Sequence, residues 1–351
     1  MWAFTSYEKI TSSATRWNLD ALSERSLSKQ QWVVTEKIHG ANFCFATDGE
    51  VIRCANRKKF LEIGDSFFSY QTLLGSLGEK VKQAFRIIKG KYPKINHIFI
   101  YGELFGGCYP HPDVPGDSNV KAVQTGVYYS PTINFCAFDI AIEYLADGKE
   151  ERIYLDYGEV MEILEGVSIF YAKPLLIGSY HQALNFPIGF DSTIPQQLNL
   201  PAIEANKAEG VVIKPVKSIY IDTPKGKIRP ILKRKIPEFN EDKRFSQAEK
   251  WVEEIENNFS ENSSSSQVDK IDLLKWEAFN LITENRLQNT ISKIGLANSR
   301  ELFNLFIEDV MEELKENQAQ LFMELSEENK QQLLQFIYQE VRKIFKLYFQ
   351  H

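Results

Sequence analysis

A chain of 351 residues, 43% of them apolar and 25% charged, can bury a core and form two domains, which excludes a wholly disordered protein. No apolar run reaches the roughly 18–20 residues of a membrane-spanning helix, and the start, MWAFTSYEKITSS, lacks the pattern of a secretion signal, so we expect an intracellular protein without a membrane anchor. The net charge of −6 argues against a nucleic-acid binder whose whole surface is basic.

The first two thirds of the chain are rich in predicted strands. QWVVTE (31–36) is apolar and β-branched, and NFCFATDGEVIRCAN (42–56) predicts two strands around Asp48-Gly49, a favoured two-residue hairpin turn. Apolar alternation or short apolar runs predict further strands at 97–104, 133–145, 151–157, 209–215 and 228–236. Helical patterns interrupt this series at 66–89 and 157–165.

The pattern changes to helices after about residue 243. Residues 245–259 are predicted to be helical, SENSSSSQ (260–267) is a polar linker, and apolar residues recur at helical spacing from residue 268 onward without a proline. We therefore expect a first domain at 1–243 that mixes strands and helices, a connecting segment at 244–267, and a small all-α domain at 268–351.

The cysteines and histidines lack the spacing of a metal site. The four cysteines, at positions 44, 54, 108 and 136, form no CxxC pair, and the five histidines are scattered. This pattern argues against a zinc module and indicates reduced thiols in a reducing compartment, with cytoplasm, nucleus and organelle all left open.

Charged residues end several of the predicted apolar strands. Lys37 follows the strand 31–36, Glu103 ends another strand, and Glu209 precedes a third. Lys233 and Lys235 are two positions apart, so on a strand they project from the same face. Each residue alone is most often a solvated surface charge, but several together are costly to bury unless they pair or meet a ligand. Residues 207–244 also hold eleven Lys/Arg against five Asp/Glu, which indicates phosphate partners.

Six segments in this order resemble the motifs of the covalent nucleotidyltransferases. EKIHGANF, CANRKKF, IYGELFGG, FCAFDI, EGVVIKP and ILKRK are similar to motifs I, Ia, III, IIIa, IV and V, and the likeness is closest to the RNA ligase 2 family, which includes the bacteriophage RNA ligase 2 and the RNA-editing ligases. DNA ligases and capping enzymes generally carry an aspartate where this chain has His39. The segment ENRLQNTISKIG (284–295) also resembles the second domain of the bacteriophage enzyme.

The resemblance implies an α+β fold and a three-step reaction. The first domain is expected to be a nucleotidyltransferase (ATP-grasp-like ligase) domain of mixed antiparallel sheets with flanking helices. Lys37 is expected to attack the α-phosphorus of ATP and form lysyl–AMP. The AMP is then expected to pass to the 5′-phosphate of RNA, and a 3′-hydroxyl to displace it.

The resemblance also implies the residues of the site. Lys37, His39, Lys233 and Lys235 are expected to be catalytic, with His39 serving the chemistry of the RNA end. Glu103 and Glu209 are expected to bind Mg²⁺ or Mn²⁺, for which carboxylate oxygens are suitable ligands. Residues expected to bind the nucleotide, beyond Lys37 and the two strand lysines, are Glu36, Asn42, Arg57, Glu103, Phe138, Glu209 and Lys214.

Several alternatives remain open at the level of the sequence. Arg286, Asp309 and Glu313 resemble RNA-binding positions of the second domain, although surface helices carry many such charges. We expect a monomer that acts on RNA ends in a duplex or bridged by a complementary strand. The rival interpretations are a DNA ligase or capping-type nucleotidyltransferase, which normally has a β-barrel after motif V, and a non-catalytic module that binds RNA ends.

Overall fold

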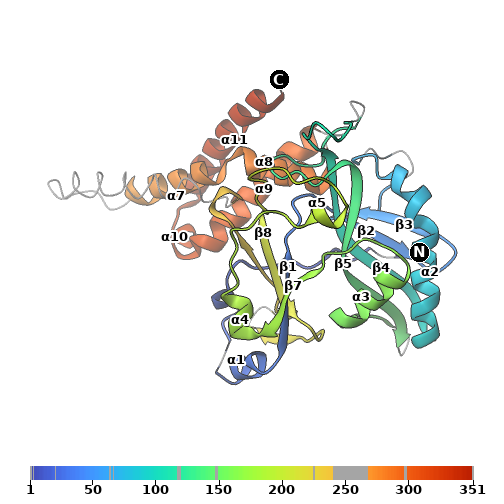
Figure 1. The fold of residues 1–351 in the computed structure, drawn as a ribbon. Coiled ribbons are helices and arrows are strands. Elements are labelled where there is room, and N and C mark those ends of the chain that lie inside the picture. Colours follow the sequence, from blue (N-terminus) through green and yellow to red (C-terminus); the bar gives the residue numbers. More distant parts are fainter. Residues whose placement is uncertain are drawn as a thin grey trace. The chain divides into compact units, whose positions relative to one another are not determined.

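The computed structural model describes residues 2, 4–19, 21–62, 65, 67–116, 120–146, 149–223, 226–239, 268–295 and 299–349 (Figure 1). The chain divides into two compact units, Met1–Ile236 and Pro237–His351. The first unit mixes antiparallel sheets with helices and the second is helical, which confirms the predicted α+β class. The connecting segment predicted at 244–267 lies outside the described residues.

A five-stranded antiparallel sheet forms one half of the first unit. Its strand order is β3 (Ile52–Asn56), β2 (Ala41–Thr47), β4 (Ile95–Cys108), β5 (Ser130–Ala146) and β6 (Lys149–Tyr154). The strands β4 and β5 are longer than the predicted apolar runs, because their pairing continues through residues of loop-like composition. This continuation extends the sheet beyond the segment that holds Glu103.

The turn between β2 and β3 differs from its prediction. Thr47 pairs with Ile52, so four residues rather than two connect the strands. One carboxylate oxygen of Asp48 accepts the N–H groups of Glu50 and Val51 at 2.9 and 2.8 Å. The prediction of a two-residue hairpin turn was therefore wrong, because the side chain of Asp48 stabilises a longer turn of the Asx type.

Two helices cover one face of this sheet, α2 (Gln71–Lys91) and α3 (Tyr157–Gly166) (Figure 1). Their apolar faces pack on inward-pointing strand residues, and together they form the largest core of the unit, which includes Phe43, Phe45, Ile98, Ile100, Val81, Phe85, Ile88, Val160 and Leu164. The other face is covered by the first residues of the chain, where Tyr7 packs with Phe99 and Tyr101. The sheet is thus buried on both sides.

A four-stranded antiparallel sheet forms the other half of the unit. Its order is β11 (Leu232–Lys235), β8 (Gly210–Pro215), β1 (Gln31–Glu36) and β7 (Pro174–Ser179). The apolar residues of one face pack with neighbouring helical segments; this core includes Trp32, Val34, Val211, Ile213, Leu232 and Ala183. By the alternation of strands, Lys37, Lys214, Lys233 and Lys235 belong to the opposite face.

The remaining elements of the first unit are short. They are η1 (Ala14–Trp17), α1 (Ala21–Ser28), α4 (Tyr180–Leu184), α5 (Ile194–Gln197), β9 (Ile221–Thr223) and β10 (Gly226–Ile228). The strands β9 and β10 form a separate two-stranded ribbon.

Helices make up the second unit. After η2 (Pro237–Phe239), the described elements are α7 (Val268–Leu281), α8 (Glu284–Ile294), α9 (Ser299–Asn317), α10 (Ala319–Met323) and α11 (Glu327–Phe349). The predicted apolar stripes are buried, including Leu302, Phe306, Val310, Leu333, Ile337 and Val341. Within the described part of the chain, no helix is long and apolar enough to cross a membrane.

Candidate active site

The turn after β1 is bonded to β8 of its own sheet and packs against β4 of the five-stranded sheet. The N–H of Lys37 donates to the carbonyl oxygen of Gly210 at 2.9 Å, which extends the pairing of β1 with β8 by one residue. A Cβ atom at Gly40 would lie 2.0 Å from the carbonyl oxygen of Leu104. Only glycine therefore allows this turn to approach β4 so closely, and this approach brings the turn that carries Lys37 against Glu103 and Leu104.

Lys37 belongs to a buried ion cluster centred on Glu209. Lys37 Nζ lies 2.7 Å from Oε2 of this glutamate, and Lys235 Nζ lies 2.9 Å from its Oε1. His39 Nδ1 lies 3.5 Å from the same Oε2. The Glu209 side chain is only 1% exposed, so a single buried carboxylate holds the two lysines and the histidine together. Three of the residues predicted to be catalytic thus meet at one point.

The charges around Glu209 keep it ionised. Burial alone would raise the pKa of Glu209, but the neighbouring Lys37 and Lys235 and a hydrogen bond with His39 outweigh burial and hold the pKa well below its usual range. The carboxylate is therefore negative throughout the neutral range. Removing its charge would leave two lysines close together in a low-dielectric site.

Glu103 lies next to this cluster in a different electrostatic state. Its strand position pairs with Asn42 on β2. Burial, and to a lesser degree the charge of Glu209, raise the pKa of Glu103 to about 7 against the opposing effects of Lys37, Arg57 and a hydrogen bond with Asn42. Glu103 therefore carries a negative charge that the protein alone does not fully stabilise.

The donor set suits a hard divalent cation at Glu103. A bound cation would favour the ionised carboxylate, which burial disfavours. Both oxygens of Glu209, in contrast, already engage a lysine. Among the described residues, no group of three or more His, Cys, Asp or Glu could hold a metal. The site thus fits a Mg²⁺ ion bound by Glu103 and by oxygens of a nucleotide or of water, rather than a metal enclosed by protein ligands.

Glu36 points away from the lysine cluster into hydrogen bonds of its own. Ser192 Oγ donates to one carboxylate oxygen at 2.6 Å, and the N–H and Oγ1 of Thr193 both donate to the other at 2.8 Å. The side chain is 3% exposed. In this arrangement the carboxylate anchors the residue before Lys37 to the segment at 192–193.

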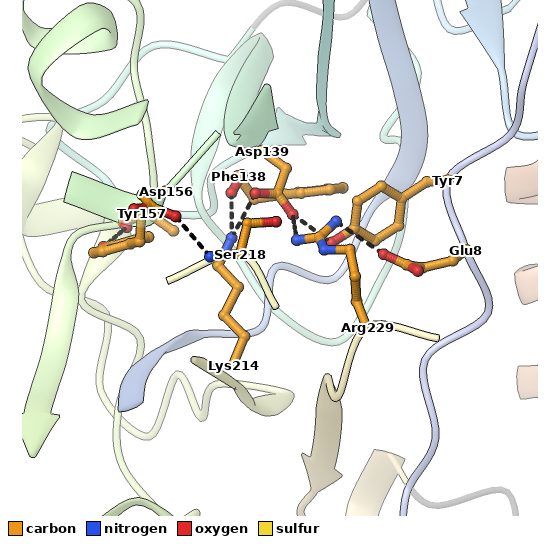
Figure 2. A network of polar contacts seen from close by, with 10 residues as sticks. Tyr7, Glu8, Phe138, Asp139, Asp156, Tyr157, Lys214, Ser218 and Arg229 are labelled. Carbon is orange, nitrogen blue, oxygen red and sulfur yellow. Dashed lines mark hydrogen bonds and ion pairs between the residues drawn. The ribbon is translucent and has the colours of Figure 1, made fainter. Parts of the chain in front are cut away.

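Lys214 lies on the same sheet face as Lys235 but has different partners. Its Nζ donates to the carbonyl oxygen of Phe138 at 2.7 Å and to Oδ1 of Asp139 at 2.9 Å. Both charged side chains are buried. Lys214 therefore links β8 to β5 and so connects the two large sheets (Figure 2).

Asp139 also holds the start of the chain. Its Oδ2 accepts from the Tyr7 hydroxyl at 2.6 Å and from the Arg229 guanidinium at 2.7 Å, and Arg229 reaches Glu8 at 2.8 Å. Figure 2 shows Lys214 on one side of this carboxylate and Arg229 on the other. Burial alone would raise the pKa of Asp139, but the two cations outweigh it and lower the pKa.

Phe138 lies at the border of this network. Its ring is partly buried and meets the Tyr7 ring edge to face, with 4.9 Å between ring centroids.

Lys233 lies on the edge strand of the four-stranded sheet. Its backbone N–H donates to the carbonyl oxygen of Thr11 at 2.8 Å, and this bond fixes the edge of the sheet.

The comparison with protein families decides the classification. Residues 30–235 match the family model described as RNA ligase, and residues 265–343 match the model described as T4 RNA ligase 2 C-terminal. The chain belongs to the RNA ligase family. The first match ends at Lys235, so it includes every residue of the Glu209 cluster.

Two curated members of this family from Trypanosoma brucei brucei are similar over most of the chain. The mitochondrial RNA-editing ligase 2 is 32% identical, over 83% of this chain and 76% of the relative. The mitochondrial RNA-editing ligase 1 is 28% identical, over 79% of this chain and 67% of the relative.

Among solved structures, the Naegleria gruberi RNA ligase with PPi has a TM-score of 0.37 at 14% identity. The match covers 66% of this chain and 56% of that chain. Mutant forms of that protein were solved with ATP and Mn and with AMP and Mn.

Two of the three polar residues singled out in the second unit, Arg286 and Asp309, form part of an ion cluster between helices. One carboxylate oxygen of Asp309 lies 2.8 Å from the Arg286 guanidinium, and the other lies 2.5 Å from Lys293 Nζ. These two cations lower the pKa of Asp309 against the opposing effect of burial. Arg286 is 2% exposed, whereas Glu313 is only partly buried, one turn further along α9. Two of the three residues thus hold α8 and α9 together within the RNA ligase second domain.

Sequence reasoning missed Tyr7, Glu8 and Arg229. Tyr7 and Glu8 lie before the first predicted strand, and Arg229 looked like one of many charges in the basic segment 207–244. The available signal was position: Arg229 stands beside the apolar pair Ile231-Leu232, where a charged side chain needs a buried partner. The partner itself lies too far away in the sequence for periodicity to indicate it.

Proposed function

We propose that this member of the RNA ligase family uses ATP and a divalent metal to join a 3′-hydroxyl to a 5′-phosphate of RNA. The observation that carries the proposal is the buried cluster in which Glu209 holds Lys37 and Lys235, within the segment that matches the family. Lysines gathered around a carboxylate at the end of a strand offer both a nucleophile and cations for phosphate oxygens.

In the first step, Lys37 Nζ gives up a proton to solvent and attacks the α-phosphorus of ATP as the neutral amine. A P–N bond forms while the P–O bond to pyrophosphate, the leaving group, breaks. Glu209 orients Nζ from 2.7 Å, and Lys235 offsets the negative charge that develops on the phosphate. We assign the same role to Lys233, whose position on β11 gives it the same strand face. Arg57 and Asn42 lie beside Glu103 and suit the phosphate side of the pocket.

We further propose that Phe138 stacks on adenine and that Glu103 would hold Mg²⁺ or Mn²⁺, which would supply positive charge to offset that of the phosphates. His39 would act after lysyl–AMP formation, when the AMP passes to the 5′-phosphate of the RNA. Glu36 and Lys214 support the pocket rather than the phosphates, because Ser192, Thr193 and Asp139 already engage their charged groups.

The physiological setting is part of the same proposal. A monomer that acts on nicks in duplex RNA fits a chain with a helical second unit, in which Arg286, Asp309 and Glu313 would support RNA contact. Four free cysteines, three of them buried, support a reducing compartment.

Covalent labelling tests the proposal directly. The wild-type chain is mixed with α-labelled ATP and Mg²⁺, and the labelled residue is located by peptide mapping. We expect label on Lys37 and none in Lys37→Ala. Lys91→Ala is the control, because Lys91 lies on α2 and pairs with Glu159. Covalent AMP on Lys37→Ala would contradict the assignment, and transfer of AMP to a 5′-phosphorylated strand separates an enzyme from a binding module.

A further inference from the structure

A buried tyrosine reaches the turn that carries Lys37 and His39. Tyr129 directly precedes β5 and is 1% exposed. Its hydroxyl accepts the backbone N–H of His39 at 2.9 Å, and its ring packs edge to face on Phe105 with 5.5 Å between centroids. The hydroxyl satisfies a backbone donor that lies two residues after the nucleophile.

The segment around Tyr129 also reaches the chain before Glu209. The side-chain amide of Asn206 accepts the N–H of Tyr128 at 2.9 Å and donates to the carbonyl oxygen of Tyr128 at 2.7 Å. Asn206 lies three residues before Glu209. The backbone at 128–129 is therefore fastened to both parts of the chain that build the ion cluster.

We propose that Tyr129 is a positioning residue for the ligase reaction: its hydroxyl fixes the backbone of His39, so that the imidazole stays beside Glu209. This proposal rests on the proposed function, in which His39 and Glu209 belong to the active site. His39 Nδ1 lies 3.5 Å from Glu209 Oε2, at the long end of a hydrogen bond, so a small rotation of the turn separates them. The orientation of the backbone therefore decides whether this contact exists.

A tyrosine of the same loop region provides a matched control. Tyr109 is 4% exposed, and its hydroxyl donates to the carbonyl oxygen of Pro201. Tyr129→Phe and Tyr109→Phe each remove one buried hydroxyl and one bond to the backbone. Only Tyr129→Phe frees the turn at His39.

The first measurement is a double-mutant cycle on AMP uptake, AMP transfer to RNA and sealing. We expect Tyr129→Phe to slow the step that depends on His39 by about tenfold, the effect of one lost hydrogen bond on a rate. In the His39→Ala background the same change should add nothing, because Tyr129 acts through His39. Tyr109→Phe should leave all three rates within about twofold. Equal losses from Tyr129→Phe in both backgrounds would overturn the proposal.

The second measurement does not depend on activity. The ring signals of His39, assigned in NMR spectra with His39→Ala, should move in Tyr129→Phe and stay in place in Tyr109→Phe. Unchanged His39 signals in Tyr129→Phe overturn the positioning role even in an active enzyme. A wild-type chain that takes up no AMP contradicts the proposed function, while the NMR result still decides the role of Tyr129.

Discussion

Glu209 is the residue on which the lysine cluster depends. Its two oxygens hold different lysines, from the turn after β1 and from β11. The resemblance to the nucleotidyltransferase motifs predicted that Lys37, Glu209 and Lys235 belong to one site, and the charges at the ends of apolar strands were consistent with it. The sequence could not predict that the charged groups of Glu36 and Lys214 bind other partners. The alternation of side chains along a strand shows on which face of the sheet a residue lies, but not how far it is from other residues.

We predict that Glu209→Gln abolishes AMP uptake, with a loss of at least about 100-fold. The amide is neutral, so Lys37 and Lys235 repel each other and Nζ of Lys37 loses its fixed place. The measurement is the rate of covalent labelling with α-labelled ATP.

Glu143→Gln is the matched control. Glu143 is also a buried glutamate, paired with the guanidinium of Arg152 and close to His97, but it lies outside the Glu209 cluster. We expect both variants to lose stability in urea unfolding and only Glu209→Gln to lose labelling. Normal labelling of Glu209→Gln would contradict the role given to this carboxylate.

Among the elements, the two large sheets and the start of the chain are tied together at Asp139. Tyr7 and Asp139 are 132 positions apart, and Arg229 follows 90 positions later. Apolar periodicity predicted most strands of the first unit and the helices α2 and α3. This periodicity could not predict the tie, because the tie depends on side chains from segments that no periodicity relates.

We predict that Asp139→Asn lowers the free energy of unfolding by about 3–5 kcal/mol at pH 7, since Lys214 and Arg229 lose their buried counter-charge. The pKa of Asp139 is lower in the folded chain than in the unfolded chain. Its stabilising effect is therefore present above the unfolded value of about 4 and is lost as the pH falls through the folded value. Urea unfolding at pH 7 and at pH 2, below the unfolded value, measures this difference.

The exposed Asp222 on β9 provides the comparison. Asp222→Asn should change the free energy of unfolding by less than about 0.5 kcal/mol at either pH. If Asp139→Asn were as stable as the wild type at pH 7, the network would not be the tie between the sheets.

At the scale of the whole molecule, the chain joins a mixed α+β unit to a helical unit. The helices of the second unit were visible in the sequence, because apolar residues recur at helical spacing from residue 268 onward without a proline. The internal pairing of Arg286 with Asp309 was not, since surface and buried charges look alike on a helix.

We predict that Arg286→Ala leaves AMP uptake within about twofold and lowers the sealing of a 3′-hydroxyl/5′-phosphate nick in duplex RNA by about tenfold or more. The change disturbs the packing of α8 on α9 and none of the Glu209 cluster. The assay compares the same nick in RNA and in DNA. Arg342→Ala, at an exposed position of α11, is the control, and an equal loss of AMP uptake in Arg286→Ala would contradict this division of tasks.

The pairing of both lysines with Glu209 has a consequence for how the pocket meets anions. The protein carries its own counter-ion, which cannot diffuse away, so an incoming phosphate must exchange with a tethered carboxylate rather than with dissolved salt. A singly charged anion gains little from this exchange, whereas a triphosphate with a metal offers several oxygens at once. Before substrate binds, the pocket should therefore bind anions with several charges in preference to anions with one charge.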